Sequence, residues 1–254
     1  MEYGLSAKDK AALRKAAHTL GADIRTKIQD VGGLTHFVVA TTTPTGETAV
    51  LAKSRNLKQS HALLFGKWIV GASWIRASIA AGTWVDEAPH EVLGDAKVTQ
   101  FVAGGPERAR LSHAKEQGSI FKDTTFFISP SALRKGMKLH DFEHLLRLAD
   151  ARIFPMSSLE AVTAATAAAV AASEEGSSSS SSSTTTTTTS ATSTNVVISD
   201  KNRLDRKARE PVENGLAIAV TEDWAHDSVS NFMLMGTGMY EVELRRNGRS
   251  SRRR

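Results

Sequence analysis

The sequence contains no cysteine among its 254 residues. This absence excludes disulfide bonds, thiolate catalysis and every zinc site built on cysteine, including zinc fingers and RING domains, from this chain. No apolar run approaches the roughly 18 residues that cross a bilayer, and the N-terminus lacks a basic stretch followed by an apolar one. We therefore expect no membrane partner and no secretory leader.

The chain has no net positive charge outside its C-terminal residues. The formal net charge is +5, but Arg245–Arg254 hold six arginines and no acid, so the rest of the chain carries −1 (5 − 6 = −1). A basic, nucleic-acid-binding body therefore does not follow from the net charge. We predict instead that a basic tail at 243–254 makes nonspecific contacts with polyanions.

One segment has the composition of an insertion. Ser177–Ser190 is an unbroken Ser/Thr tract, and an Ala-rich stretch, Ala161–Ala172, precedes it. A Ser/Thr tract cannot bury enough apolar surface to offset its ordering entropy. We predict a low-complexity insertion at about 157–194, with a short Ala-rich helix followed by a disordered loop.

The remaining sequence falls into two blocks with the same order of elements. The first block predicts helices over 7–21, 57–65 and 72–81 and strands over 35–41 and 68–70. The second predicts strands over 124–128, 151–154, 196–199 and 216–220 and helices over 140–149 and 222–232. Alternating strands and helices favour parallel sheets covered by helices. The repeat predicts two α/β domains, 1–93 and 119–242, joined by a polar linker at 94–118.

Several motifs in these blocks resemble a known family. They are Thr35–Val39, Gly66–Val70, Ala72–Ile75 and Trp84–Glu87 in the first block, and Thr221–Val229 in the second. They resemble the strand, glycine-turn and tryptophan-helix signatures of BRCT domains. The resemblance implies an α/β fold of two BRCT domains in tandem, each a four-stranded parallel sheet flanked by helices. In such domains the helix tryptophans, here Trp74 and Trp224, are core residues, which is also what their amphipathic helices predict.

Two further motifs narrow the resemblance. Arg55–Lys58 leads into Gly66–Trp68, and the linker contains Gly105–Arg110. Both are similar to the subgroup of tandem BRCT proteins that includes the breast-cancer susceptibility protein and its RING partner. This resemblance implies a noncatalytic module without a cofactor, which binds phosphoserine or phosphothreonine segments of partner proteins in a nuclear DNA-damage response.

Lys58 is the main candidate for phosphate binding. It falls in the first turn of a predicted helix, where the helix dipole disfavours a cation and favours a bound anion. From spacing alone, a solvated surface lysine is an equal alternative. In similar tandems this lysine acts with a hydroxyl at the end of the first strand and the N–H of the following glycine. The glycine matches Gly4, Tyr3 stands where serine or threonine is expected, and Asn56 is a substitute hydrogen-bonding group.

The resemblance also implies a peptide-specificity pocket for an aromatic side chain three residues after the phosphoserine. The backbone of Arg55 would hold the peptide main chain, and the pocket would be lined by Ser60, Met137 and His226. Ser60 and His226 replace large apolar side chains, so we expect a roomier, more polar pocket. The predicted ligand is pSer-x-x-aromatic or a more polar variant.

Two other interpretations remain open. Tyr3 favours a phosphate-independent scaffold for proteins or DNA ends, and the chain could also be an accessory domain of an enzyme whose catalytic part lies outside it. No catalytic residue is predicted within the chain. His226, Asp227 and Ser228 are the residue types of a hydrolase triad, but consecutive helical residues point about 100° apart and cannot form a relay. The histidines show no metal-ligand spacing, so we predict no metal site.

Overall fold

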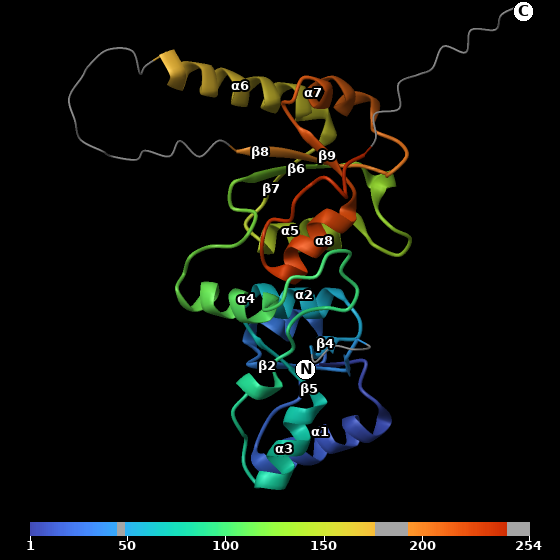
Figure 1. Cartoon of the computed structure of the whole chain (residues 1–254), viewed down its shortest axis with the longest axis vertical. Coiled ribbons are helices and arrows are strands. Elements are labelled where there is room, and N and C mark those ends of the chain that lie inside the picture. Colours follow the sequence, from blue (N-terminus) through green and yellow to red (C-terminus); the bar gives the residue numbers. More distant parts are fainter. Residues whose placement is uncertain (45–48, 176–192, 243–254) are drawn as a thin grey trace, which may run out of the picture. The chain divides into compact units, whose positions relative to one another are not determined.

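The computed structural model describes residues 1–44, 49–175 and 193–242 (Figure 1). The predicted Ser/Thr loop, Ser177–Ser190, and the basic tail, 243–254, lie outside these residues. The chain divides into two compact units. Unit 1 comprises Met1–Lys122, His144–Asp150 and Ala225–Met235, and unit 2 comprises Asp123–Glu143, Ala151–Trp224 and the chain from Gly236 onward. No helix in the described ranges has the length and apolar character needed to span a bilayer.

Unit 1 is built on a parallel sheet with the strand order β1-β2-β5. Its strands are β1 (Glu2–Tyr3), β2 (His36–Val39) and β5 (Trp68–Gly71), and a short antiparallel pair follows, β3 (Thr41–Thr42) with β4 (Leu51–Ala52). The helices are α1 (Ala7–Leu20), α2 (Leu57–Leu64), α3 (Ala72–Ala81) and α4 (Gly105–Ala114), with short 3-10 turns η1 (Ile28–Gly33) and η2 (Ala88–His90). Helices α1 and α3 lie on one side of β2 and β5, and α2 and α4 lie on the other (Figure 1).

Local signals set the boundaries of the first helix. Ser6 caps α1 by accepting a hydrogen bond from Asp9 N, and Gly21 ends it in the left-handed conformation. Leu13 and Ala16 of α1 pack with Val38 of β2 and Trp74 of α3 in the core. Trp74 is therefore the buried core residue that its helix pattern predicts.

We expected a four-stranded sheet in each domain. The parallel sheet of unit 1 has three strands among the described residues. In unit 2 the segment after helix α5 (Leu139–Leu148) forms strand β7 (Arg152–Phe154), whereas the segment after α1, 22–27, forms no strand. The reason lies in β1, whose two residues pair with Val38 and Val39 of β2. A two-residue strand offers only one backbone N–H and C=O pair on its free edge, too few to order a neighbouring strand.

Unit 2 contains the expected four-stranded parallel sheet, in the order β7-β6-β8-β9. The strands are β6 (Thr124–Ile128), β7 (Arg152–Phe154), β8 (Thr194–Ile198) and β9 (Ile218–Val220). The predicted Ala-rich helix is α6 (Leu159–Glu175), which covers one face of the sheet together with α7 (Arg209–Glu213) and the turn η5 (Arg206–Ala208) (Figure 1). Unit 2 also holds the turns η3 (Pro130–Ala132) and η4 (Met156–Ser158), whereas the residues of α5 (Leu139–Leu148) and of α8 (Glu222–Asn231) are divided between the two units.

The predicted polar linker, 94–118, contains helix α4 and belongs to unit 1. Arg110 of α4 anchors this helix to the body of the unit. Its guanidinium lies 3.5 Å from the centre of the Trp68 ring, and it donates to Glu91 at 3.0 Å. The few apolar residues of this helix form no clear apolar face, which is why its sequence resembles a linker.

Candidate functional site

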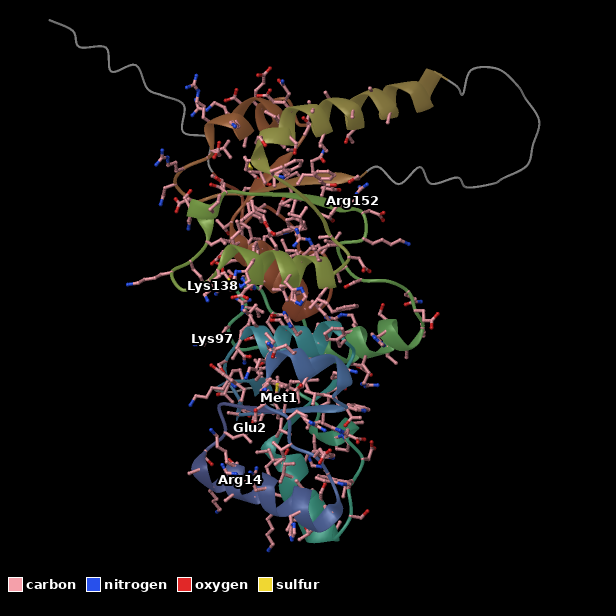
Figure 2. The ribbon with its side chains drawn as sticks, turned by 180° about the vertical axis from the view of Figure 1, so that it is seen from behind. Met1, Glu2, Arg14, Lys97, Lys138 and Arg152 are labelled. Atoms are coloured by element: carbon pink, nitrogen blue, oxygen red, sulfur yellow. The ribbon has the colours of Figure 1, made fainter. Side chains whose placement is uncertain are left out.

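The turn that follows β1 is one part of the candidate phosphate site. Met1 precedes β1, which begins at Glu2 (both are labelled in Figure 2), and Gly4 follows the strand with a φ of +70°. Gly4 is exposed, and its N–H has no acceptor among the described residues. A Cβ at this position would lie 3.4 Å from Ala40 Cβ and 3.8 Å from Ser54 Oγ. The left-handed backbone therefore favours glycine and leaves an amide available beside the Ser54 hydroxyl.

The N-terminus of α2 is the second part. Asn56 is its N-cap, and Asn56 Oδ1 accepts from Gln59 N at 3.1 Å. Within the described part of the chain, the N–H groups of Leu57 and Lys58 have no acceptor, and the first turn holds no acidic residue. Free N–H groups at the positive end of a helix favour an anion. Asn56 is thus a cap that holds these amides in place.

Lys58 lies in this first turn, as the sequence predicts. Its ammonium donates to the carbonyl of Thr26 at 2.6 Å in an exposed setting. An ammonium has three N–H donors, so this one bond leaves others for an anion. The same contact ties α2 to the segment that follows α1.

The two hydroxyl groups near Gly4 have different settings. Tyr3 is 41% exposed, so the residue expected to supply a phosphate hydroxyl is largely in solvent. Ser54 is half-buried, lies next to Gly4, and its hydroxyl has no hydrogen-bond partner among the described residues. Sequence reasoning missed Ser54. In the sequence, Ser54 is only a serine two residues before the N-cap Asn56. It becomes a candidate because the fold brings it beside Gly4.

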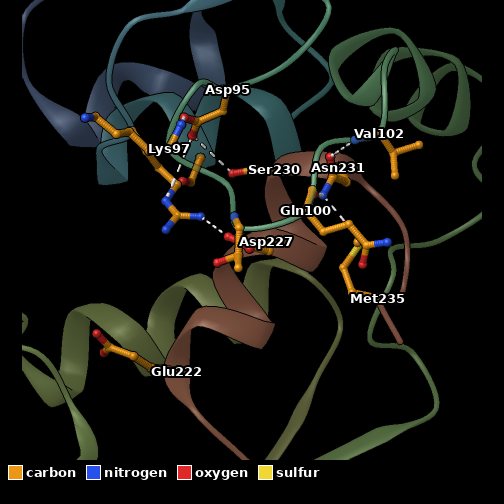
Figure 3. Close-up of polar contacts among 12 residues, drawn as sticks. Asp95, Lys97, Gln100, Val102, Glu222, Asp227, Ser230, Asn231 and Met235 are labelled. Atoms are coloured by element: carbon orange, nitrogen blue, oxygen red, sulfur yellow. Dashed lines mark hydrogen bonds and ion pairs between the residues drawn. The ribbon is translucent and has the colours of Figure 1, made fainter. Parts of the chain in front are cut away.

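The role predicted for the Arg55 backbone stays a prediction, and the Arg55 side chain makes contacts of its own. The guanidinium is largely buried, donates to Asp227 Oδ1 at 2.5 Å, and lies 3.9 Å from Asp95 Oδ2. Asp227 is fully buried, and its other oxygen accepts from Thr99 N at 2.6 Å (Figure 3). Arg55 is therefore an anchor between α2, the 95–102 segment and the end of α8 in unit 1.

Burial also shapes the electrostatics of Asp95. Desolvation raises the pKa of Asp95, and hydrogen bonds from Lys97 N (2.7 Å) and Ser230 Oγ (3.3 Å), together with the Arg55 charge, oppose that rise. The neighbouring charge of Asp227 adds to the rise. Because desolvation is the largest cause, Asp95 holds a proton more readily in the folded state than in the unfolded state.

The four residues of the predicted specificity pocket do not share one environment. Ser60 is 6% exposed, donates to Asn56 O at 3.3 Å, and lines a cavity of about 10 Å³ with Gln59, Asp95 and Ser230. His226 is 3% exposed in unit 1. Met137 belongs to unit 2, where its N–H donates to Arg134 O at 3.0 Å. The specificity pocket remains a prediction.

The chain is similar in sequence to two plant proteins. No family model matches the chain. It is 33% identical over 149 residues to BRCA1-associated RING domain protein 1 of Arabidopsis thaliana. The aligned region covers 59% of this chain and 19% of that protein. It is 29% identical over 125 residues to the Protein BREAST CANCER SUSCEPTIBILITY 1 homolog of the same plant, covering 49% of this chain and 12% of the relative. The chain therefore matches about a fifth or less of each relative's length.

A solved structure supports the fold. The BRCT5-BRCT6 domains of S. pombe Brc1 align with a TM-score of 0.53 and 12% identity, covering 92% of this chain and 91% of that one. At this identity the likeness concerns the fold alone. The repeated α/β units, the buried tryptophan helices and the two plant relatives agree with it. The fold is therefore that of tandem BRCT domains, and the sequence is similar to the two plant proteins over 49–59% of this chain.

Proposed function

We propose that the chain is a noncatalytic reader of phosphorylated protein segments. One observation carries the proposal: the Gly4 amide and the Ser54 hydroxyl lie side by side, just ahead of an α2 N-terminus that holds Lys58 and no acid. These groups are all donors or cations, so the site suits an anion with several acceptor oxygens. A phosphate group has three such oxygens and a charge of about −1.5 to −2 at neutral pH.

Each group would have a distinct role. The Lys58 ammonium would form the charged contact and exchange its Thr26 carbonyl for a phosphate oxygen. Gly4 N–H and Ser54 Oγ would donate to the other oxygens, because both lack partners in the described structure. Asn56 would hold the helix amides in place through its bond to Gln59 N. Ser54 would thus replace the hydroxyl that Tyr3 does not provide.

Peptide selectivity is part of the same proposal. The Arg55 backbone would hold the peptide main chain, and Ser60, Met137 and His226 would contact the residue three positions after the phosphoserine. Because two of these side chains are polar, we propose tolerance of polar residues at that position. The tandem BRCT fold and the two plant relatives support work in a nuclear DNA-damage response.

Tyr3 supports a second candidate, a phosphate-independent scaffold for proteins or DNA ends. In this alternative the exposed Tyr3 marks a phosphate site that has been lost, and the Lys58–Thr26 contact is only structural. A separate alternative is an accessory domain of an enzyme whose catalytic part lies outside this chain, and the much greater length of the two relatives supports it.

A phosphopeptide-library pull-down with matched unphosphorylated peptides separates the two candidates. Binding of selected peptides is then measured by calorimetry with the parent, Lys58→Ala and, as a control, Lys15→Ala on the exposed side of α1. A charge-assisted phosphate contact is worth about 1.5–3 kcal/mol, so Lys58→Ala should weaken phosphopeptide binding roughly tenfold to a hundredfold. The Lys15→Ala control should leave it unchanged. Equal binding of phosphorylated and plain peptides by the parent would favour the scaffold.

A further inference from the structure

Unit 2 contains a dense cluster of cations that the net charge conceals. Lys201–Arg209 holds five basic residues and one acid, a charge of +4 over nine residues (5 − 1 = 4), in a body whose charge without the arginine tail is −1. All five cationic residues are exposed: Lys201, Arg203, Arg206, Lys207 and Arg209. We call these five side chains the cationic surface.

The backbone beneath the cationic surface is ordered by its own contacts. Ala208 is fully buried and packs with Val197 and Ala217, and Leu204 packs against the same core cluster. Asp205 Oδ1 accepts from Lys207 N at 3.0 Å, and Ser199 Oγ donates to Arg203 O at 2.9 Å. Apolar side chains therefore face the core, and the cations face solvent on a fixed scaffold.

The acid within this segment does not neutralise the cations. Among the described residues, no carboxylate lies within the 4.0 Å ion-pair distance of any of the five. Elsewhere on the surface, exposed cations do have partners, such as Arg76 with Asp9 at 2.7 Å and Arg25 with Asp23 at 3.2 Å. The cationic surface is therefore a local concentration of unneutralised positive charge.

The last described residue, Val242, lies beside the same scaffold. It belongs to the core cluster that contains Ala208, and its N–H donates to Ala219 O at 3.0 Å. The sequence that follows, 243–254, contains six arginines and one acid. The described chain therefore ends beside the scaffold that carries the cationic surface.

We propose that the cationic surface binds the phosphodiester backbone of a nucleic acid. Three of its five cations are arginines, whose planar guanidinium matches phosphate oxygens in two-point contacts. The segment contains no aromatic side chain on which a base could stack. Recognition is therefore of the backbone and independent of base sequence. The cationic surface shares no residue with the proposed phosphopeptide site, whose phosphate-binding groups belong to unit 1.

The test compares variants of the full chain that lose equal charge. The surface variant replaces three of the five side chains of the cationic surface (Arg206→Gln, Lys207→Gln, Arg209→Gln). Its matched control replaces three exposed cations of α1 (Lys8→Gln, Arg14→Gln, Lys15→Gln; Arg14 is labelled in Figure 2). A third variant changes all six tail arginines to glutamine. Binding to duplex DNA and to single-stranded RNA of about 20 nucleotides is measured by fluorescence anisotropy over a range of salt concentrations.

Each lost phosphate contact lowers the slope of log K against log salt by about 0.9, so the surface variant should lose roughly 2–3 units of slope on duplex DNA. It should bind at least about tenfold more weakly at low salt, whereas the α1 control should change little. The tail variant should retain binding that depends on the cationic surface. Similar losses on RNA would show that the shared phosphodiester backbone is recognised, and a loss on only one polymer would identify that polymer as the ligand.

Three results would overturn the proposal. The surface variant and the α1 control could lose binding equally, which would mean that only net charge matters. The tail variant could lose all binding, which would assign the effect to the tail alone. Poly-glutamate could compete as well as DNA at equal charge, which would point to an acidic polypeptide. Circular dichroism melting of each variant separates these results from unfolding.

Discussion

Replacing Asp227 with alanine is expected to destabilise unit 1 strongly. Asp227 is fully buried and accepts from Arg55 Nη1 at 2.5 Å and from Thr99 N at 2.6 Å. Its removal leaves a largely buried guanidinium and a backbone N–H without these partners. Removing one member of a buried ion pair typically costs about 3–5 kcal/mol. Asp95, 3.9 Å from Arg55, remains as a partial partner and keeps the loss within that range.

The measurement is urea and thermal unfolding followed by circular dichroism. For a chain of this size, a loss of about 3–5 kcal/mol corresponds to a fall in Tm of roughly 6–20 °C. The control is Asp23→Ala, because Asp23 forms an ion pair with Arg25 in which both side chains are mostly exposed. An exposed pair contributes about 0–1 kcal/mol.

A double variant tests the cause of the effect. Arg55→Met combined with Asp227→Leu removes both charges and keeps the volume apolar, so its stability should be closer to the parent than that of Asp227→Ala. The reasoning is refuted if Asp227→Ala unfolds within about 1 kcal/mol of Asp23→Ala. It is also refuted if the double variant is less stable than the single one, since the unpaired charge would then not be the cause.

Asp95, Gly105 and Ser54 provide separate tests. Because burial raises the pKa of Asp95 above its ordinary value of 3.8, the folded state binds more protons and stability should fall as pH rises above 3.8 towards the raised value. Asp95→Asn should reduce that slope in urea unfolding at a series of pH values, and an unchanged slope would contradict the assignment. A Cβ at Gly105 would overlap the backbone carbonyl of Ser230, so Gly105→Ala should cost about 1–3 kcal/mol in urea unfolding. Gly33→Ala, where a Cβ would meet no atom within 4 Å, should cost less; equal costs would refute the overlap. Ser54→Ala should weaken phosphopeptide binding in calorimetry by roughly 2-fold to 12-fold, the value of one hydrogen bond, while Tyr3→Phe should not. The reverse order would assign the phosphate hydroxyl to Tyr3.

Much of the fold follows from local sequence patterns. Ser6 and Gly21 mark the ends of α1, and the Ala-rich stretch forms α6, because caps and helix propensity act over a few residues. The tryptophan helices were also predictable, since Trp74 and Trp224 occupy apolar positions of amphipathic helices and are 4% exposed. Helix α4 was not, because it buries few side chains and is ordered by tertiary contacts such as Arg110 over Trp68.

The candidate sites depend on contacts between distant residues. Lys58, Gly4 and Asn56 were recognisable from motifs, but Ser54 became a candidate only because sheet pairing brings it beside Gly4. The Arg55–Asp227 bond joins residues 172 positions apart, and no local pattern specifies it. The cations of 201–209 are visible in the sequence, yet it is the burial of Ala208 and Leu204 against unit 2 that turns them towards solvent. Local propensity thus determined the helices and strands. Burial and long-range pairing determined which side chains meet, because the free energies of burial and pairing depend on the whole packed chain.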